Sequence, residues 1–308
     1  MTLRYRILPE QRRGKFRSLL ASGRCLRVME AHNALSAAIA TSASASNAAG
    51  EQVGFDGLWL SGFSAASAHA LPDAELARFE KKMETTWEIL GATNKFCIAD
   101  GDTGGDVLSA QFLCSQLEAM GVSAVILEDK VFPKRTSLAA EVEHELENPF
   151  VFANKIGRAK EVLLTGDFLV FARIESLIAG RDLADALERA RVYLESPADG
   201  LVIHSRDKSG EEVFSFARQY ASLCDNLGIR KPLVCIPTAY NFAREKELAA
   251  LGFSVVIYGN HQVRSACKAM RSVCESVLKH ERSLEADAAC IPLPELFALV
   301  GVDEKTAQ

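Results

Sequence analysis

The amino-acid sequence predicts an α/β protein whose parallel strands close into a (β/α)8 TIM barrel. Eight short apolar runs follow one another along the chain, as expected for parallel strands buried on both faces. Most are separated by a stretch with helical periodicity, and such alternation is typical of a parallel sheet with right-handed crossovers. Eight repeats fit a closed barrel better than an open sheet. No glycine-rich dinucleotide loop follows the first strand, which also disfavours a Rossmann domain.

The predicted elements follow this alternation. Strands are expected at residues 25–31, 57–61, 96–100, 124–128, 169–174, 200–205, 233–238 and 255–260. The clearest helices are expected at 74–90, 106–120, 182–194 and 211–227, followed by an amphipathic helix at 263–279. Residues 294–300 predict one more short helix, with a proline in its first turn.

Two segments depart from the pattern. Residues 41–52 are rich in Ala, Ser and Asn and predict a flexible surface loop after the first helix. Residues 130–148 form a long, charged connection after the fourth strand, and long ordered loops are often lids or binding loops. We expect one barrel domain over residues 1–308, with an N-terminal helix and a C-terminal helical extension.

The composition is that of an ordinary soluble globular protein, with 48% hydrophobic and 24% charged residues. The formal net charge of -5 disfavours non-specific binding to nucleic acid or to an anionic membrane. An anionic substrate remains compatible with this charge, because a site can be locally positive.

The cysteines and the first residues indicate the compartment. Eight cysteines are present without a CxxC pair, and free buried thiols in a reducing cytoplasm are favoured over disulfides. The first 20 residues are charged and broken by Pro9, so they do not resemble a signal peptide. No apolar run has the length of a membrane span. We therefore expect a cytoplasmic protein.

Polar or small residues stand at the C-terminal ends of nearly all the predicted strands, whereas the N-terminal ends carry no such set. Barrel active sites form at the C-terminal face from the ends of several strands, so these residues predict where the site lies. They are Glu30 with His32 and Asn33, Ser61 with Gly62, Asp100 with Asp102, Glu128 with Asp129 and Lys130, Arg173 with Glu175, His204 with Ser205, Thr238, and Asn260 with His261.

Carboxylates form the sharpest cluster among these strand ends. Asp100 and Asp102 follow the third strand, and Glu128 follows the fourth. Carboxylates at one barrel mouth repel each other unless a cation neutralises them. Oxygen ligands without Cys or His nearby in sequence favour Mg²⁺, with Mn²⁺ as the alternative, over Zn²⁺. The competing interpretation is that these carboxylates cap helices and form salt bridges.

Cationic residues accompany the carboxylates. Arg173 and His204 end adjacent strands, and Lys130 and Lys134 lie in the expected lid. They suit a small anionic substrate, since Arg grips a carboxylate or phosphonate with two hydrogen bonds. Taken alone, His204 is more typical of a buried structural histidine. The turn Ser61-Gly62-Phe63 offers backbone N–H groups to an anion.

Several strings in residues 25–269 resemble the phosphoenolpyruvate mutase/isocitrate lyase superfamily. They include AHNALSA at 31–37, LWLSGF at 58–63, DGDTG at 100–104 and ARIESLIAG at 172–180. The most specific is EDKVFPK at 128–134, which looks like the phosphonate branch of the superfamily. The carbon–carbon lyase branch places a catalytic Cys in its lid, where this chain reads PKRTS at 133–137.

The resemblance implies a reaction. Relatives of the mutase type carry Asn where this chain has Thr136, and relatives of the phosphonopyruvate hydrolase type carry Thr. It therefore implies Mg²⁺-dependent hydrolysis of the C–P bond of phosphonopyruvate to pyruvate and phosphate. The nearest alternative is phosphoenolpyruvate mutase. Others are a decarboxylase or lyase acting on oxaloacetate or a substituted malate, and a barrel that binds without catalysis.

The resemblance also implies roles for individual residues. It implies metal ligation by Asp100, with Asp73, Asp102 and Glu128 reached largely through water. It implies that the oxoacid and its phosphonyl group contact Ser61, Gly62, Phe63, Arg173 and His204. It implies a mobile lid around residues 130–137, which brings Lys130 and Thr136 to the site. Thr136 would position the attacking water or itself accept the phosphoryl group, and we favour the first role because no obvious base activates its hydroxyl. A homotetramer, a dimer of dimers with an exchanged C-terminal helix, is also implied.

The loop after the third strand departs from the resemblance. Relatives often read DTGYGN or DTGFGN, whereas this chain reads DTGGD at 102–106. The aromatic residue is absent and one residue is deleted next to the expected site. The insertion at 41–52 is also unusual, and both differences concern the substrate rather than the fold.

Overall fold

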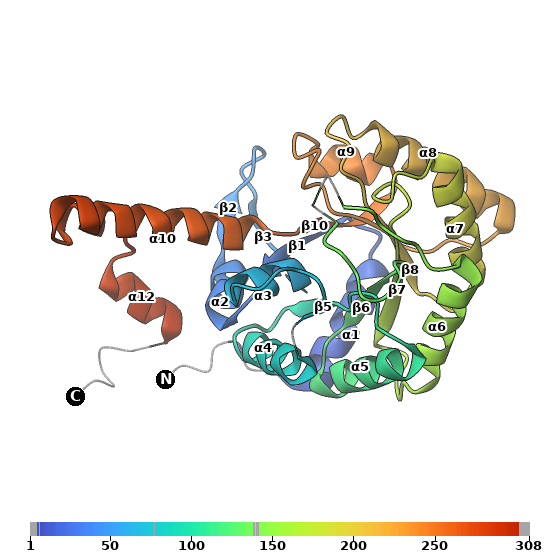
Figure 1. Cartoon of the computed structure of the whole chain (residues 1–308), viewed down its shortest axis with the longest axis horizontal. Helices are drawn as coiled ribbons and strands as arrows, with labels where there is room; N and C mark the ends of the chain where they lie inside the picture. The colour runs from blue at the N-terminus through green and yellow to red at the C-terminus, as the bar shows by residue number, and fades with distance from the viewer. Residues whose placement is uncertain (1–4, 6, 77, 138, 140–141, 302–308) are drawn as a thin grey trace.

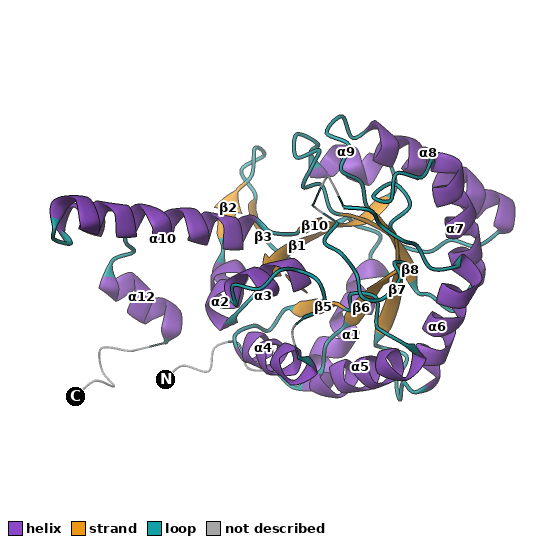
Figure 2. Cartoon of the chain, in the orientation of Figure 1, coloured by secondary structure: helices purple, strands orange, loops and turns teal. Residues whose placement is uncertain are grey.

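The structure, a computed structural model, describes residues 5, 7–76, 78–137, 139 and 142–301. Eight parallel strands form a closed barrel, each hydrogen-bonded to its neighbours in chain order and the last to the first. Figure 2 shows the strands enclosed by helices, so the predicted (β/α)8 barrel is confirmed. The strands are β1 (Leu26–Ala31), β4 (Gly57–Leu60), β5 (Phe96–Asp100), β6 (Ala124–Glu128), β7 (Leu169–Ile174), β8 (Gly200–Ile203), β9 (Leu233–Cys235) and β10 (Phe253–Tyr258).

Helices cover the outside of the barrel. They are α2 (Ala34–Ser42), α3 (Gly62–Ala68), α4 (Phe79–Gly91), α5 (Val107–Met120), α6 (Pro149–Glu161), α7 (Leu183–Glu195), α8 (Glu211–Leu227) and α9 (Glu245–Ala250). The helix α10 (His261–His280) extends away from the barrel and is followed by α11 (Leu284–Asp287) and α12 (Leu293–Val300) (Figure 1). Among the described residues, no helix is both long enough and apolar enough to cross a bilayer.

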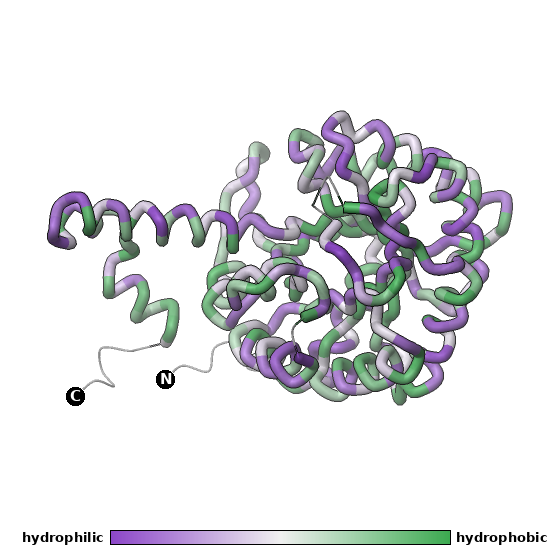
Figure 3. Tube along the Cα trace, in the orientation of Figure 1, coloured by the Kyte–Doolittle hydropathy of each residue, from purple (hydrophilic) through white to green (hydrophobic). Residues whose placement is uncertain are grey.

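Alternation along the strands divides the core into two layers. Successive side chains of a strand point to opposite faces, so every second residue enters the barrel. The interior cluster contains Val28, Trp59, Ile98, Ile126, Phe171, Val202, Val234 and Ile257. Their neighbours in sequence pack between the strands and the helices in a separate cluster. Figure 3 shows hydrophobic residues along the central strands and a largely hydrophilic α10.

The helix α1 (Pro9–Leu20) closes the N-terminal end of the barrel. Phe16 is fully buried, and its ring centroid lies 4.7 Å from that of Phe96 and 5.7 Å from that of Phe171. Arg12 is also buried, and its Nη2 donates to the carbonyls of Leu90 (2.7 Å) and Thr93 (2.9 Å). With this end filled by aromatic rings, the polar strand ends open only at the opposite face.

Two local predictions are wrong. The expected loop at 41–52 instead contains an antiparallel hairpin of β2 (Ser44–Ser46) and β3 (Gln52–Gly54). Its turn is stabilised by Asn47, whose Oδ1 accepts the N–H groups of Ala49 (2.9 Å) and Glu51 (3.0 Å). The helix expected from residue 74 begins at Phe79, because residues 73–75 form a turn and Glu75 has a positive φ of 54°.

The packing at the closed end predicts the effect of a glycine substitution. A Cβ at Gly57 would overlap the ring of Phe96, which Phe16 holds from the other side. We expect Gly57→Ala to lower the free energy of unfolding by about 1–3 kcal/mol. Gly91→Ala, where nothing lies within 4 Å of the added Cβ, should change it by less than about 0.5 kcal/mol. Urea denaturation measures both, and equal stabilities would contradict close packing here.

Candidate active site

Strand register brings the charged strand ends together. Glu128 of β6 lies directly opposite Arg173 of β7. The inward-facing positions of the apolar interior continue, two residues further, into Asp100, Glu128, Arg173 and His204. The same alternation turns Asp129 outward, where its carboxylate accepts hydrogen bonds from Arg189 (3.0 Å) and Tyr193 (2.7 Å). Asp129, one of the predicted strand-end residues, therefore packs among the helices and not in the site.

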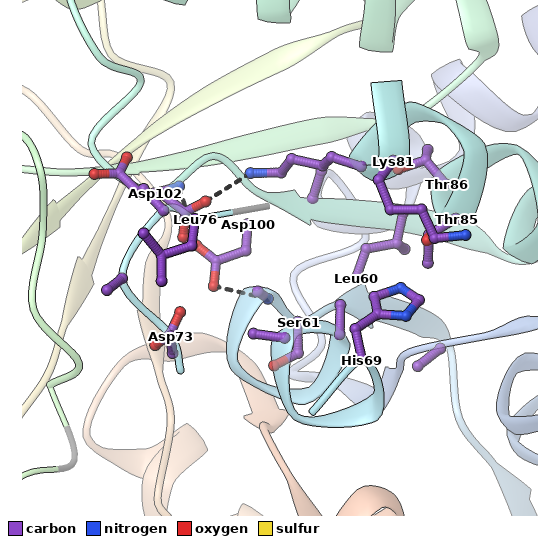
Figure 4. A pocket seen from close by; sticks show the side chains of 18 of the residues that line it. Leu60, Ser61, His69, Asp73, Leu76, Lys81, Thr85, Thr86, Asp100 and Asp102 are labelled. Carbon is purple, nitrogen blue, oxygen red and sulfur yellow. Dashed lines mark hydrogen bonds and ion pairs between the residues drawn. The ribbon is translucent and has the colours of Figure 1, made fainter. Parts of the chain in front are cut away.

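A cavity opens at this face of the barrel, and it contains seven of the predicted site residues. The lining residues are Trp59, Ser61, Phe63, Asp73, Asp100, Lys134, Thr136, Ser137, Arg173, His204, Ile236, Thr238, Gly259 and Asn260. An adjoining hollow shares Ser61, Asp73 and Asp100 with the cavity and adds Gly62 and Asp102. Figure 4 shows Asp73, Asp100 and Asp102 on one side of that hollow, with His69 and Thr85 on the other.

Glu175 is the centre of a buried ionic network beneath the cavity. Its carboxylate is fully buried and lies 2.6 Å from Nε of Arg173, 3.2 Å from Nζ of Lys130 and 3.0 Å from Nδ1 of His204. Arg173 also pairs with Glu128 through Nη2. Burial favours the neutral acid, but Arg173, Lys130 and His204 outweigh it and hold the pKa of Glu175 well below its usual value. In this geometry Glu175 can orient Arg173.

Lys134 neutralises a second pair of carboxylates. Its buried ammonium lies 2.6 Å from Asp102 and 3.1 Å from Asp73, and Lys82 of α4 lies 2.8 Å from the other oxygen of Asp102. Burial disfavours the charged lysine, but Asp102, Asp100 and Asp73 hold the pKa of Lys134 well above its usual value. Burial likewise opposes the charge of Asp102, yet Lys134 and Lys82 keep its pKa below the usual value.

These contacts correct the argument that only a metal could neutralise the carboxylates. Asp102 and Glu128 are each paired with protein cations. Within the part of the chain that the structure describes, no group of three or more His, Cys, Asp or Glu side chains is arranged to hold a metal ion. The set of four predicted carboxylates does not by itself form a complete ligand shell.

Asp100 remains suited to a hard cation. Within the described residues its two oxygens accept only backbone N–H groups, from Gly62 (3.1 Å) and Asp102 (3.2 Å), and Nη1 of Arg173 is 3.9 Å away. The carboxylate lines the cavity and has lone pairs that can coordinate a cation. Mg²⁺ is commonly held by one or two carboxylates, with waters and substrate oxygens completing the octahedron. Asp100 therefore fits a single direct ligand, and the N–H of Gly62 serves Asp100 rather than an anion.

Thr136 and Ser137 are lid residues that line the cavity. Ser137 is buried and donates to Glu175 (2.8 Å), and it also contacts Lys130. The hydroxyl oxygen of Thr136 is buried and has no hydrogen-bond partner among the described residues. Because a buried hydroxyl normally has a partner, this group is available to a ligand or a water. Lid mobility stays a prediction.

Several contributors to the site differ from the prediction. Glu30 was predicted among the strand ends but lies away from the lining, where it accepts a hydrogen bond from Ser64 (2.7 Å) and thereby supports α3 next to the cavity. Lys82 and Glu75 lie in a segment predicted to be plain helix, and their partners are far away in sequence. A single acidic or basic residue within a predicted helix does not indicate in the sequence that it will contact a distant segment.

The network around Glu175 predicts a pH-dependent stability. Glu175→Gln removes the charge that compensates Arg173 and Lys130, so we expect a loss of about 3–5 kcal/mol at pH 7. Because the folded pKa of Glu175 is depressed, its contribution is complete above the unfolded pKa of about 4.3 and is lost as pH falls through the folded pKa. The difference between wild type and variant should therefore narrow below about pH 4.

Urea denaturation at pH 7 and at acidic pH measures this difference. The control is Glu188→Gln, which removes an exposed carboxylate paired with Arg191 on α7 and should change stability by less than about 0.5 kcal/mol. A difference for Glu175→Gln that is independent of pH would contradict the depressed pKa.

Comparison with known proteins assigns the family. The chain matches the family described as phosphoenolpyruvate phosphomutase over residues 16–278. It is 38% identical to a phosphonopyruvate hydrolase of Variovorax sp. (strain Pal2), over 94% of each chain. It is 33% identical to a phosphoenolpyruvate phosphomutase of Tetrahymena pyriformis, over 90% of this chain and 87% of the relative. A crystal structure of phosphonopyruvate hydrolase complexed with oxalate and Mg²⁺ shares a TM-score of 0.84 at 35% identity, covering 96% of this chain and 97% of the other. The chain therefore belongs to the phosphoenolpyruvate mutase family, within the phosphoenolpyruvate mutase/isocitrate lyase superfamily of enzymes.

Proposed function

We propose that this enzyme hydrolyses the C–P bond of phosphonopyruvate to pyruvate and phosphate. The observation that carries the proposal is the hydroxyl of Thr136, which is buried at the cavity without a partner among the described residues. The mutase type of relative has Asn at this position. A small hydroxyl leaves room for a water and can orient it by a hydrogen bond. The 38% identity to a phosphonopyruvate hydrolase supports the same reaction.

The substrate anion is held by groups that still have free hydrogen-bonding positions. Arg173 lines the cavity and pairs with Glu175 through Nε and with Glu128 through Nη2, so Nη1, 3.9 Å from Asp100, remains for a substrate oxygen. His204 contacts Glu175 through Nδ1, which leaves Nε2 for a phosphonyl oxygen. Both groups are buried and fixed, so they are preorganised for the charge that develops on phosphorus. Ser61 and Phe63 complete the wall beside Asp100.

The reaction uses one water and needs an electron sink. The water oxygen, oriented by Thr136, attacks phosphorus and forms the new P–O bond. The C–P bond breaks, and its electron pair delocalises onto the 2-oxo group as the enolate of pyruvate. The enolate carbon then takes a proton, and the water releases one, so the products are pyruvate and phosphate. Lys130 and Ser137 hold the lid in register during this step through Glu175.

Asp100 is the residue proposed to hold Mg²⁺, with Asp73, Asp102 and Glu128 around it. When bound, Mg²⁺ supplies Lewis-acid stabilisation of the developing negative charge on the oxoacid oxygens. A related phosphonopyruvate hydrolase has been crystallised with Mg²⁺ and oxalate, and oxalate resembles the enolate of pyruvate in its adjacent oxygens. This relative supports Mg²⁺ as the metal, with Mn²⁺ as a substitute.

Phosphoenolpyruvate mutase is the second candidate. It would use the same metal and the same anion-binding groups, and the Tetrahymena relative supports it at 33% identity. The two reactions differ in whether water reaches the phosphoryl group. Thr136 is therefore the residue that distinguishes them. A lyase is disfavoured because residues 130–148 contain no Cys.

We also propose a homotetramer of cytoplasmic subunits with an exchanged C-terminal helix. The helix α10 is 20 residues long and Val263 is its one buried residue. Figure 1 shows it extending away from the barrel, as a helix that packs on another subunit would do.

Metal removal tests the role of Asp100. We expect EDTA to abolish phosphate release and Mg²⁺ or Mn²⁺ to restore it. Asp100→Asn should reduce turnover by about three orders of magnitude or more, because a preorganised electrostatic group is lost. It should also weaken Mn²⁺ binding measured by electron paramagnetic resonance. Asp225→Asn, an exposed carboxylate on α8, is the control. Full activity after thorough chelation would remove the metal from the proposal.

Substitutions at Thr136 separate hydrolase from mutase. Thr136→Ala should lower kcat for phosphate release by about two to three orders of magnitude, as for one well-placed polar group. KM should change little if the contact is made mainly in the transition state. Thr136→Ser should retain most activity, and Thr136→Asn should lose hydrolysis. Phosphate release and phosphoenolpyruvate formation are measured side by side. A normal rate in Thr136→Ala would mean that the residue only caps a turn of the lid.

A further inference from the structure

Glu75 joins three separate segments next to the cavity. Its Oε1 accepts hydrogen bonds from the backbone N–H (3.1 Å) and the hydroxyl (2.8 Å) of Thr103. Its Oε2 accepts the backbone N–H of Lys134 at 2.8 Å. One carboxylate thus links the turn before α4, the loop after β5 and the lid. All three partners donate, so both oxygens of the side chain act as acceptors.

The loop after β5, which Glu75 contacts through Thr103, is held in place by further contacts. Thr103 belongs to the shortened loop 102–106, and the buried Lys155 of α6 donates to the carbonyls of Thr103 (3.2 Å) and Gly105 (2.9 Å). The loop is therefore held from Lys155 on one side and from Glu75 on the other. Gly104 has a positive φ, and a Cβ at this position would meet Leu127 at 3.2 Å, so the loop backbone lies close to the barrel wall. A contact to Glu75 consequently ties the lid to a fixed point.

On its other side, Glu75 holds the part of the lid that contains Thr136. The hydrogen bond to the N–H of Lys134 fixes the backbone two residues before Thr136. It also sets the start of the Lys134 side chain, whose ammonium reaches Asp102 and Asp73. On the far side of Thr136, Ser137 is held by Glu175. Thr136 thus stands between two anchored residues, and one anchor depends on Glu75.

We propose that Glu75 is a positioning residue that fastens the lid over the cavity and places the Thr136 hydroxyl. The consequence for catalysis rests on the proposed function, whereas the structural link does not. The backbone of Glu75 lies in the left-handed region, with φ of 54°, which residues other than glycine seldom adopt. A side chain with three hydrogen bonds explains why a glutamate is held there.

Two variants grade the link. Glu75→Gln keeps the length but has a single acceptor oxygen, so it can serve Thr103 or Lys134 but not both. Glu75→Asn tolerates the left-handed backbone, yet it is one methylene shorter and cannot span both partners. Glu80→Gln, an exposed glutamate in the first turn of α4, is the matched control.

Hydrogen exchange of the ligand-free protein tests the link without any substrate. In Glu75→Asn we expect the amides of Lys134 and Thr103 to exchange at least about tenfold faster, since each loses its acceptor. Glu75→Gln should show a smaller acceleration. The amides of β10 should be unchanged in both variants and in Glu80→Gln. Unchanged exchange at Lys134 in Glu75→Asn would overturn the proposal, as would faster exchange throughout the barrel, which indicates a general structural role.

Steady-state kinetics of the same variants test the effect of Glu75 on catalysis. With phosphonopyruvate and Mg²⁺ we expect kcat for phosphate release to fall at least about tenfold in Glu75→Asn, with a smaller change in KM. A wild-type protein without phosphate release would reject the proposed function and leave the exchange result to decide on Glu75. A loose lid with normal kcat would show that Glu75 holds the lid without placing Thr136.

Discussion

Charge compensation at the open end of the barrel is the constraint on which the rest of the site depends. Five carboxylates meet four cations there, and six of these nine side chains are buried. A buried charge is strongly unfavourable unless it is paired and hydrogen-bonded. The lid supplies Lys130 and Lys134, so the same contacts that neutralise the barrel carboxylates also hold the lid in place. Removing one member therefore disturbs both the charge balance and the position of Thr136.

Much of the fold and part of the site follow from the pattern of apolar residues along the strands, which can be read from the sequence. Apolar runs predicted all eight strands, because parallel strands buried on both faces are continuously hydrophobic. Alternation within each strand then decides which polar ends enter the barrel. Counting in steps of two from Ile98, Ile126 and Phe171 leads to Asp100, Glu128 and Arg173. The same count sends Asp129 to the helix layer, so the sequence held the information that separates it from Glu128.

Other features depend on distances that a sequence does not encode. Lys82 pairs with a carboxylate 20 positions away, and Glu75 reaches the lid across 59 positions. Such contacts arise only when loops between elements settle against each other. The hairpin at 44–54 was missed for a related reason, since its turn relies on Asn47 accepting local N–H groups rather than on apolar alternation. The pairing of Asp102 with lysines likewise requires the lid to fold back over the mouth.

The local charge balance supports a divalent cation even though the carboxylates are paired. Asp73, Asp100, Asp102, Glu128 and Glu175 outnumber Lys82, Lys130, Lys134 and Arg173 by one. A cavity with this excess repels an anionic oxoacid, because like charges in a site of low dielectric interact strongly. Among the described residues, Asp100 has the most distant cationic partner of the five, with Nη1 of Arg173 3.9 Å away, so the least compensated charge lies where a cation can bind. A divalent ion there would offset this negative charge before an anionic substrate enters. Under the proposed function, this charge balance favours metal binding before the anion reaches Arg173 and His204.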